Sequence, residues 1–209
     1  GGEFFALIHP KGSSDFHVAE TSIGGTGWRT LDETLPTAVW DRSQLAFAVD
    51  PDDSATLYAA TTVNGILTIF STSDKGATWH PTLEVPSAHR IMIWTAHRHQ
   101  VFVEQLAGED AAAQFYFSVD GGATWMPSGL HYRAGGESMY VGAAGHIVTQ
   151  TSVDATTYHL FTLDPFSGRF SLLDTYVLGA GASIGVVVEG VSTAFIYAKS
   201  DGTYRLSLA

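Results

Sequence analysis

The sequence predicts an all-β protein built from a repeated unit of about four antiparallel strands. Three observations lead to this prediction: the composition, a short motif that recurs along the chain, and apolar runs separated by turn residues. The chain has 209 residues, of which 22 are glycine, 12% are aromatic and only 15% are charged. Such a composition favours strands and turns over long helices.

The charge balance excludes some classes of partner. Ten Lys and Arg residues stand against 21 Asp and Glu residues, which gives a formal net charge of −11. An acidic surface repels phosphate backbones, so we expect no nucleic acid partner. The chain has no cysteine, which excludes disulfides and thiolate chemistry. No apolar run reaches the length of about 18 residues that a membrane-spanning helix needs, so we expect no membrane span in this chain.

The recurring motif appears in two nearly identical segments, STSDKGATWH at 71–80 and FSVDGGATWM at 117–126. They align as Thr72-x-Asp74-x-Gly76-x-Thr78-Trp79 and Ser118-x-Asp120-x-Gly122-x-Thr124-Trp125, and the two tryptophans are 46 residues apart. Degraded copies end at Trp28, at Phe170 and near 200–204. A period in the mid-forties predicts the four-stranded blade of a β-propeller.

Apolar runs fill the space between the motifs in the same order each time, and we label the predicted strands A (innermost) to D. In the second unit the runs are 45–51, 56–63, 66–73 and 78–85, and in the third unit they are 91–96, 101–107, 114–120 and 124–130. Asn64-Gly65 falls between the second and third runs of its unit, and this dipeptide predicts a two-residue hairpin.

The repeat also predicts the domain organisation. The first unit begins at strand B, because Phe5 precedes Trp28 by 23 residues just as Phe102 precedes Trp125. We therefore expect one domain, 1–209, with units near 1–37, 38–86, 87–131, 132–177 and 178–209, the first and last holding three strands. A small ring of about five blades is the favoured arrangement. Two ways of closing it stay open: the termini complete one another's blades, or the chain is a piece of a longer propeller.

The pattern S/T-x-D-x-G-x-T-W resembles the Asp-box, and most of the chain resembles the Asp-box (BNR repeat) β-propellers, sialidase-like and sortilin-like. This resemblance implies a fold rather than a function, because members of the group have unrelated functions. It implies an Asp-box turn between strands C and D, away from the ligand face. In such a turn the Asp can accept bonds from nearby amides, the Gly permits positive φ, and the Trp can bury its ring. The residues assigned this structural role are Thr72, Asp74, Gly76, Trp79, Ser118, Asp120, Gly122 and Trp125. The first copy keeps Trp28 but has Ile23 in place of the Asp, which predicts that ring packing matters more than the carboxylate.

Propellers bind ligands with their D–A and B–C loops, at the end opposite the C–D turn. The predicted D–A loops contain aromatic, histidine and arginine residues suited to a sugar, a peptide or an anionic group. The candidate ligand-binding residues are Trp40, Arg42, His89, Arg90, His131, Tyr132 and Arg133. We expect a non-catalytic, secreted or extracytoplasmic sensor or scaffold domain that binds a carbohydrate, peptide or protein. Whether it is the soluble domain of a longer protein stays open. We expect no cofactor and no metal, and the oligomeric state stays open.

A glycan-processing hydrolase is the alternative. Arg42, Arg90 and Arg133 fall in three successive D–A loops, which a sialidase-like carboxylate site would need. The family's Arg-Ile-Pro motif is met only by HRIM at 89–92, and no Tyr–Glu pair is assignable. Other glycosidases need two carboxylates about 5 to 10 Å apart. Glu109 or Asp110 with Asp41 or Asp154 are the candidates for such a pair.

Two polar turns raise the question of metals. His97 and His99 have the spacing of half a zinc or copper site, although a polar surface turn explains them equally well. The segment Asp50-Pro-Asp-Asp53 could bind calcium, but an Asp-Pro turn is the better interpretation.

Overall fold

The computed structural model shows an all-β protein. It describes residues 3–8, 17–22, 24–34, 46–63, 66–86, 90–106, 112–127, 132–133, 139–141, 147–152, 156–164, 169–177, 184–189, 193–198 and 202–207. Within these residues, 19 strands form five antiparallel sheets that follow one another in chain order.

We number the sheets one to five. The first sheet consists of β1 (Glu3–Ile8), β2 (His17–Ser22) and β3 (Arg29–Thr34). The second consists of β4 (Ala46–Val49), β5 (Leu57–Val63), β6 (Ile66–Thr72) and β7 (His80–Pro86). The third consists of β8 (Arg90–Ala96), β9 (Gln100–Leu106), β10 (Ala112–Ser118), β11 (Met126–Pro127) and β12 (Tyr132–Arg133). The fourth consists of β13 (Met139–Val141), β14 (Ile147–Ser152), β15 (Thr157–Asp164) and β16 (Arg169–Val177). The fifth consists of β17 (Ile184–Glu189), β18 (Thr193–Ala198) and β19 (Gly202–Ser207).

The predicted apolar runs lie in these strands, with one difference in the third sheet. The run 124–130 was expected to form one outer strand, but two short strands pair with β10 instead. Tyr116 and Phe117 pair with β11, whereas Ala112 and Ala113 pair with β12. The interruption follows Pro127, which has no N–H to donate to a continuing ladder. Elsewhere the hairpin prediction agrees with the register: Asn64 and Gly65 lie outside the described residues, and Val63 pairs with Ile66 on either side of them.

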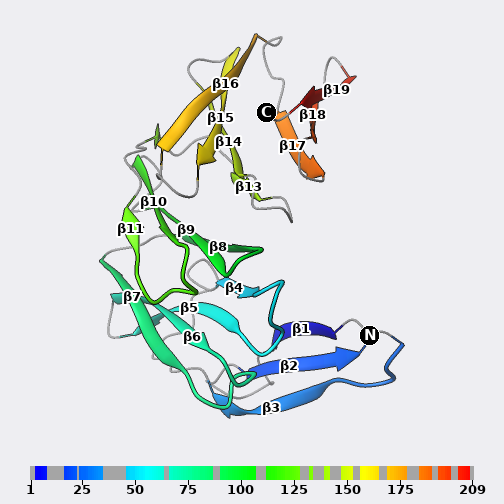
Figure 1. Ribbon diagram of the computed structural model, residues 1–209, viewed down its shortest axis with the longest axis vertical. Coiled ribbons are helices and arrows are strands. Elements are labelled where there is room, and N and C mark those ends of the chain that lie inside the picture. The colour runs from blue at the N-terminus through cyan, green and yellow to red at the C-terminus, as the bar shows by residue number, and fades with distance from the viewer. Residues whose placement is uncertain are drawn as a thin grey trace.

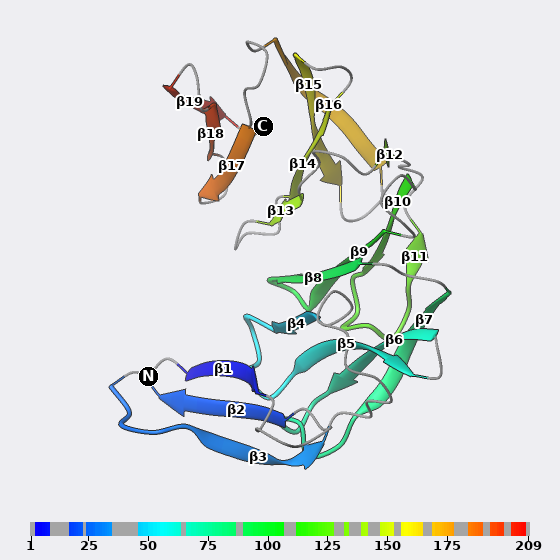
Figure 2. The same cartoon turned by 180° about the vertical axis from the view of Figure 1, so that it is seen from behind.

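The five sheets are arranged along an arc (Figures 1 and 2). The first strands of successive sheets contact one another, β4 with β8, β8 with β13 and β13 with β17. The first and fifth sheets lie at the two ends of the arc and are apart in both views. In the described pairings these two three-stranded sheets are separate.

The described core lies between sheets, and the second sheet buries both of its faces. Alternation along β5 shows this directly: Tyr58 and Ala60 pack in a cluster with Ile91 and Val103 of the third sheet. Leu57 points the other way and packs with Val18 of the first sheet. Successive side chains of a strand point to opposite faces, so a central strand serves two neighbouring cores. Among the described residues, the structure contains no helix with the length and apolarity needed to cross a membrane.

Candidate functional site

The structure describes three of the seven predicted ligand-binding residues. Trp40, Arg42, His89 and His131 fall outside the described residues, as do the acidic candidates Asp41, Glu109, Asp110 and Asp154. Arg90 is the first residue of β8, and Tyr132 and Arg133 form β12. The backbone positions of these three residues are therefore the part of the predicted site that the structure describes.

The strand register brings these three residues to the same end of the third sheet. Arg90 pairs with Leu106, Leu106 with Ala113, and Ala113 with Tyr132, so the four residues form one row across the sheet. The predicted B–C loop is 107–113, of which the structure describes Ala112 and Ala113. Arg90 and Tyr132, from two predicted D–A loops, and Ala113, from the predicted B–C loop, therefore lie in one row of the sheet.

The turn after β6 is organised around the carboxylate of Asp74. Asp74 Oδ1 accepts hydrogen bonds from the Thr72 hydroxyl at 2.5 Å and from the Thr78 amide at 2.9 Å. The Thr78 hydroxyl donates to Asp74 Oδ2 at 2.6 Å. The Thr72 hydroxyl also accepts the amide of Gly76 at 3.0 Å. These hydroxyl and amide donors, with Thr72 the strongest, lower the pKa of Asp74 to about 2.

The turn after β10 repeats this geometry. Asp120 Oδ1 accepts from the Ser118 hydroxyl at 2.7 Å and from the Thr124 amide at 2.9 Å, and Asp120 Oδ2 accepts from the Thr124 hydroxyl at 2.6 Å. The Ser118 hydroxyl accepts the amide of Gly122 at 2.7 Å. The Thr124 hydroxyl is the main cause of a lowered pKa at Asp120. The oxygen atoms of both carboxylates thus accept hydrogen bonds within their own turns and stabilise them.

One position of these turns differs between the two copies. Each turn has two successive residues with positive φ, Lys75 (59°) and Gly76 (88°) in one, and Gly121 (71°) and Gly122 (85°) in the other. Lys75 accepts this left-handed backbone although it is not glycine. Its Nζ lies 2.9 Å from Glu3 and 3.4 Å from Glu20, both in the first sheet. The lysine therefore links its turn to the first sheet through two ion pairs.

The motif tryptophans pack against the preceding sheet in the two complete copies. Trp79 packs with Leu7 of the first sheet, and Trp125 packs on the cluster that contains Tyr58 of the second sheet. Trp28 differs: 57% of it is exposed. The sequence-based expectation that the first copy retains its tryptophan for packing is therefore wrong, because the first sheet has no preceding described sheet against which Trp28 could pack.

The first copy also forms a different turn. The Thr21 hydroxyl donates to the carbonyl of Gly27 at 2.8 Å, and positive φ is found at Gly24 rather than at Gly25, which aligns with the motif glycine. Without the carboxylate, the turn lacks the acceptor that organises the complete copies.

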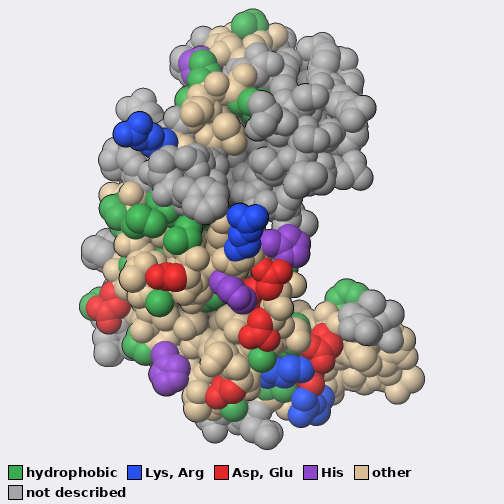
Figure 3. All heavy atoms as spheres, viewed as in Figure 1, with side chains coloured by type: hydrophobic (Ala, Val, Ile, Leu, Met, Phe, Trp, Pro, Cys, Tyr) green, Lys and Arg blue, Asp and Glu red, His purple; other side chains and the backbone are tan. Residues whose placement is uncertain are grey.

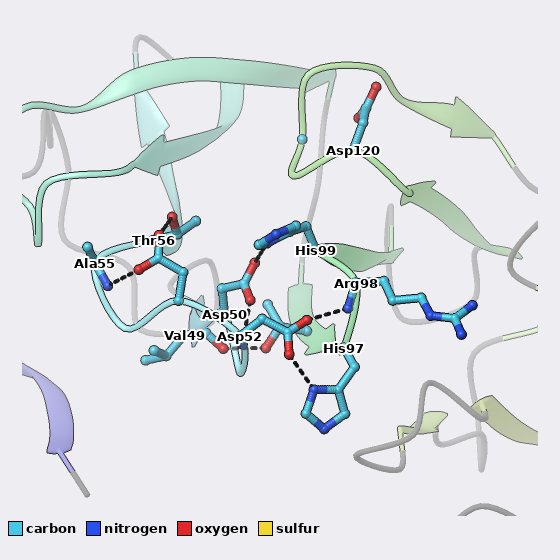
Figure 4. Close-up of polar contacts among 12 residues, drawn as sticks. Val49, Asp50, Asp52, Ala55, Thr56, His97, Arg98, His99 and Asp120 are labelled. Carbon is cyan, nitrogen blue, oxygen red and sulfur yellow. Dashed lines mark hydrogen bonds and ion pairs between the residues drawn. The ribbon is translucent and has the colours of Figure 1, made fainter. Parts of the chain in front are cut away.

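Four of the described contacts join the second and third sheets beside these turns (Figure 4). The Thr95 hydroxyl donates to the carbonyl of Val49 at 2.5 Å. His97 Nδ1 lies 2.6 Å from Asp52 Oδ1, and His99 Nδ1 lies 2.8 Å from Asp50 Oδ2. Asp52 also accepts the Arg98 amide. The bond from His97, followed by that amide, lowers the pKa of Asp52.

The same contacts involve residues of the two polar turns that raised the question of metals. His97 and His99 each use one ring nitrogen on a different carboxylate, so they do not form a paired ligand set through Nδ1. Asp50 Oδ1 accepts the amide of Asp52 at 2.8 Å, and Asp53 accepts the amide of Ala55 at 3.0 Å, which confirms a carboxylate-bound turn. In the described part of the chain, no cluster of three or more His, Asp or Glu residues is arranged to hold a metal ion.

Charged and histidine side chains lie close together on the face seen in Figure 3, over the second and third sheets. Sequence reasoning did not single out this meeting of turns from two sheets. The shared polar character of 50–53 and 97–99 was visible, but their pairing depends on how neighbouring units dock.

No model of a known protein family and no curated protein sequence matches the chain. Several solved structures match the chain. YCF48 bound to D1 peptide is 14% identical with a TM-score of 0.54, covering 90% of this chain and 58% of that one. The SapL1 lectin in complex with alpha methyl fucoside is 12% identical with a TM-score of 0.57, covering 99% and 76%. A structure from a study of two prolyl endopeptidases is 14% identical with a TM-score of 0.64, covering 98% and 32%.

YCF48 and the SapL1 lectin are β-propeller proteins. The antiparallel sheets of this chain are thus arranged as in β-propellers, and at such identities the likeness bears on the fold alone. The chain spans little more than half the length of YCF48 and about a third of the endopeptidase chain.

Proposed function

We propose that the chain is a non-catalytic, extracytoplasmic β-propeller domain of five blade units with Asp-box turns. The loops at the end of the sheets opposite those turns bind a carbohydrate or peptide ligand. One observation carries the proposal: the register row that places Arg90 and Tyr132 at the same end of the third sheet. Arg133, beside Tyr132, adds a second cation at that end.

The dimensions of this row suit an extended polar ligand. Three strand spacings of about 4.8 Å separate Arg90 from Tyr132, so the row is roughly 14 Å across. This is the length of a peptide of about four extended residues, at about 3.3 Å per residue. Arginine recognises carboxylates by paired hydrogen bonds, and an aromatic side chain can stack on an apolar ligand face. The seven predicted binding residues would supply this chemistry.

The opposite end of the sheets is a poorer candidate for this function. Both oxygens of Asp74 and of Asp120 accept hydrogen bonds within their own turns. These carboxylates consequently have little capacity left for a substrate. The Asp-box role proposed for them is structural.

Glycan and peptide arrays probed with the purified chain test the proposal. We expect binding on one of the two arrays, and a loss of at least about tenfold in affinity for Arg90→Ala and Tyr132→Ala, as for interface hot spots. Arg98→Asn is the matched control, because it removes an arginine at the other end and asparagine tolerates the left-handed backbone there (φ 67°). Equal affinity in all three variants would contradict the assignment of the ligand end. Hydrolysis of fluorogenic glycosides that Arg90→Ala abolishes would support the hydrolase instead.

A further inference from the structure

A cavity of about 320 Å³ lies between the second and third sheets, at the end that carries the Asp74 and Asp120 turns. We call it the seam cavity. Tyr58 and Ser71 from β5 and β6 form one side, and His99, Asp120 and Gly121 from two turns of the third sheet form the other. Its volume is within the range of small-molecule sites, which begins at about 300 Å³.

Tyr58 provides the cavity with an unpartnered hydrogen-bonding group. The residue is fully buried, and among the described residues its hydroxyl has no hydrogen-bond partner. A Cβ atom placed on Gly121, which lines the cavity, would lie 3.5 Å from this hydroxyl. Buried polar groups in folded proteins are nearly always paired, so a donor left in this way indicates a ligand that accepts its hydrogen bond.

The part of the cavity lining that the third sheet contributes is held in place by its own contacts. The amide of Gly121 donates to the carbonyl of His99 at 2.9 Å, and the His99 ring is bound to Asp50 at 2.8 Å. The cavity therefore lies between two parts of the structure that are fixed to each other. A preformed site of this kind loses little conformational entropy when a ligand binds.

The two copies of the turn show why the cavity exists at this seam. In the turn after β6, Lys75 stands at the position that Gly121 has in the turn after β10. Lys75 extends over the neighbouring sheet, with its Nζ 5.9 Å from the Phe5 ring centroid on β1 and in ion pairs with Glu3 and Glu20. Gly121 has no side chain, so no corresponding group extends from this turn over the second sheet, and Gly121 and Tyr58 of β5 both line the cavity.

The surrounding charges determine which ligands fit. Burial and then the nearby carboxylates Asp50, Asp120 and Asp53 raise the pKa of Tyr58, so the hydroxyl stays a neutral donor. The same carboxylates disfavour an anion. They are not free to bind a cation, since Asp50 holds His99 and Asp120 holds Thr124. The surrounding charges therefore favour an uncharged ligand that accepts a hydrogen bond from Tyr58.

We propose that the seam cavity binds an uncharged, hydroxyl-bearing small molecule of about monosaccharide size, with Tyr58 donating to one of its oxygens. Ser71 and His99 would offer further hydrogen bonds around it. This site is distinct from the ligand end of the proposed function, which lies at the opposite end of the third sheet.

The test uses four uncharged probes, the methyl glycosides of fucose, galactose, glucose and mannose, with glucuronic acid as the charged counterpart. Saturation-transfer-difference NMR and calorimetric titration measure their binding. We expect at least one glycoside to bind more tightly than glucuronic acid. Tyr58→Phe should weaken it about tenfold, the effect of one neutral hydrogen bond. Gly121→Lys should weaken it at least as much by filling the cavity.

The variants are chosen to fold. Tyr58→Phe removes an unpaired buried donor and should not lower the melting temperature, whereas a purely structural hydroxyl would make it fall. Lysine is accepted at the equivalent turn position, as Lys75 shows at φ 59°. Tyr116→Phe is the matched control, because the Tyr116 hydroxyl donates to Gln114 at 3.0 Å and does not line the cavity.

Binding of no glycoside, or equal binding in wild type and Tyr58→Phe, would overturn the proposal. Arg90→Ala separates the two sites: it should leave seam-cavity binding unchanged, and Tyr58→Phe should leave binding at the ligand end unchanged. Failure of one proposal is thereby distinguishable from failure of the other.

Discussion

His99 and Asp50 join the second and third sheets through a contact of 2.8 Å between the ring Nδ1 and a carboxylate oxygen. The Asp50 side chain is almost completely buried, at 1% exposure, whereas the His99 side chain is about half exposed, at 54%. A buried carboxylate thus has its partner on a neighbouring sheet. Removing that partner would leave an uncompensated buried charge.

The first prediction is that this contact makes stability depend on pH. The hydrogen bond to Asp50 raises the pKa of His99 above its usual value of 6.5. A raised folded-state pKa gives stabilisation that is complete below about pH 6.5 and is lost as pH rises through the higher value. His99→Asn keeps a nitrogen donor and suits the left-handed backbone (φ 56°) but cannot carry the charge.

Chemical denaturation of wild type and His99→Asn at pH 5.5 and pH 8.5 measures this effect. The difference in unfolding free energy between the two proteins should be larger at pH 5.5. A difference that does not change between the two pH values would show that the charge on His99 contributes nothing.

The second prediction concerns Asp74 in acid. Its pKa is lowered to about 2 by the Thr72 hydroxyl and then by Thr78. A lowered folded-state pKa gives stabilisation that is present above the ordinary value of 3.8 and is lost as pH falls toward 2. Asp74→Asn lacks this contribution, so the stability gap to wild type should be full at pH 5 and should close near pH 2. Asp120→Asn should behave in the same way, and acid titration followed by circular dichroism measures both. A gap that persists unchanged at pH 2 would contradict the assigned bonds.

The third prediction compares two tryptophans of the same repeat. Trp79 packs with apolar side chains of two sheets, and its replacement by alanine should cost about 3 kcal/mol of unfolding free energy. Trp28 is 57% exposed, so Trp28→Ala should change stability by no more than about 0.5 kcal/mol. Asp74→Asn should cost much less than Trp79→Ala. Urea denaturation gives all three values, and equal losses at Trp28 and Trp79 would refute the packing assignment.

The fourth prediction uses the unusual backbone of Lys75. Lys75→Gly relieves a left-handed conformation that disfavours side chains, but it removes the ion pairs with Glu3 and Glu20. Salt screens ion pairs and leaves backbone strain unchanged. The stability of the variant relative to wild type should therefore increase between about 0.02 M NaCl and about 1 M NaCl, where the Debye length falls to about 3 Å. Melting curves at the two salt concentrations provide the measurement. If the stability of Lys75→Gly relative to wild type falls with salt, the ion pairs of Lys75 do not stabilise the wild-type protein.

The features that sequence predicted best are those that depend on local chemistry. The strand runs follow from alternating apolar residues and turn residues, and the roles of Asp74 and Gly76 follow from their types and spacing. The split of the last strand in the third sheet could also have been anticipated, because Pro127 lies inside the run.

The features that sequence could not predict depend on neighbouring sheets. Lys75 and Gly121 occupy a variable position of the motif, and only the docked structure shows that one bridges a seam while the other leaves a cavity. The exposure of Trp28 likewise depends on what lies before the first sheet rather than on its own residues. The same holds for the histidine–aspartate contacts, which join turns 45 or more residues apart.

The exposed ring of Trp28 makes the first sheet an optical reporter. Indole emission shifts to the blue and escapes aqueous quenchers when another surface excludes water from the ring. Any partner, neighbouring unit or second copy that covers this end of the arc would change the fluorescence of Trp28 while leaving the already packed Trp79 and Trp125 nearly unaffected. Iodide quenching of wild type, compared with that of Trp28→Phe, would then show whether this end of the arc is open in solution.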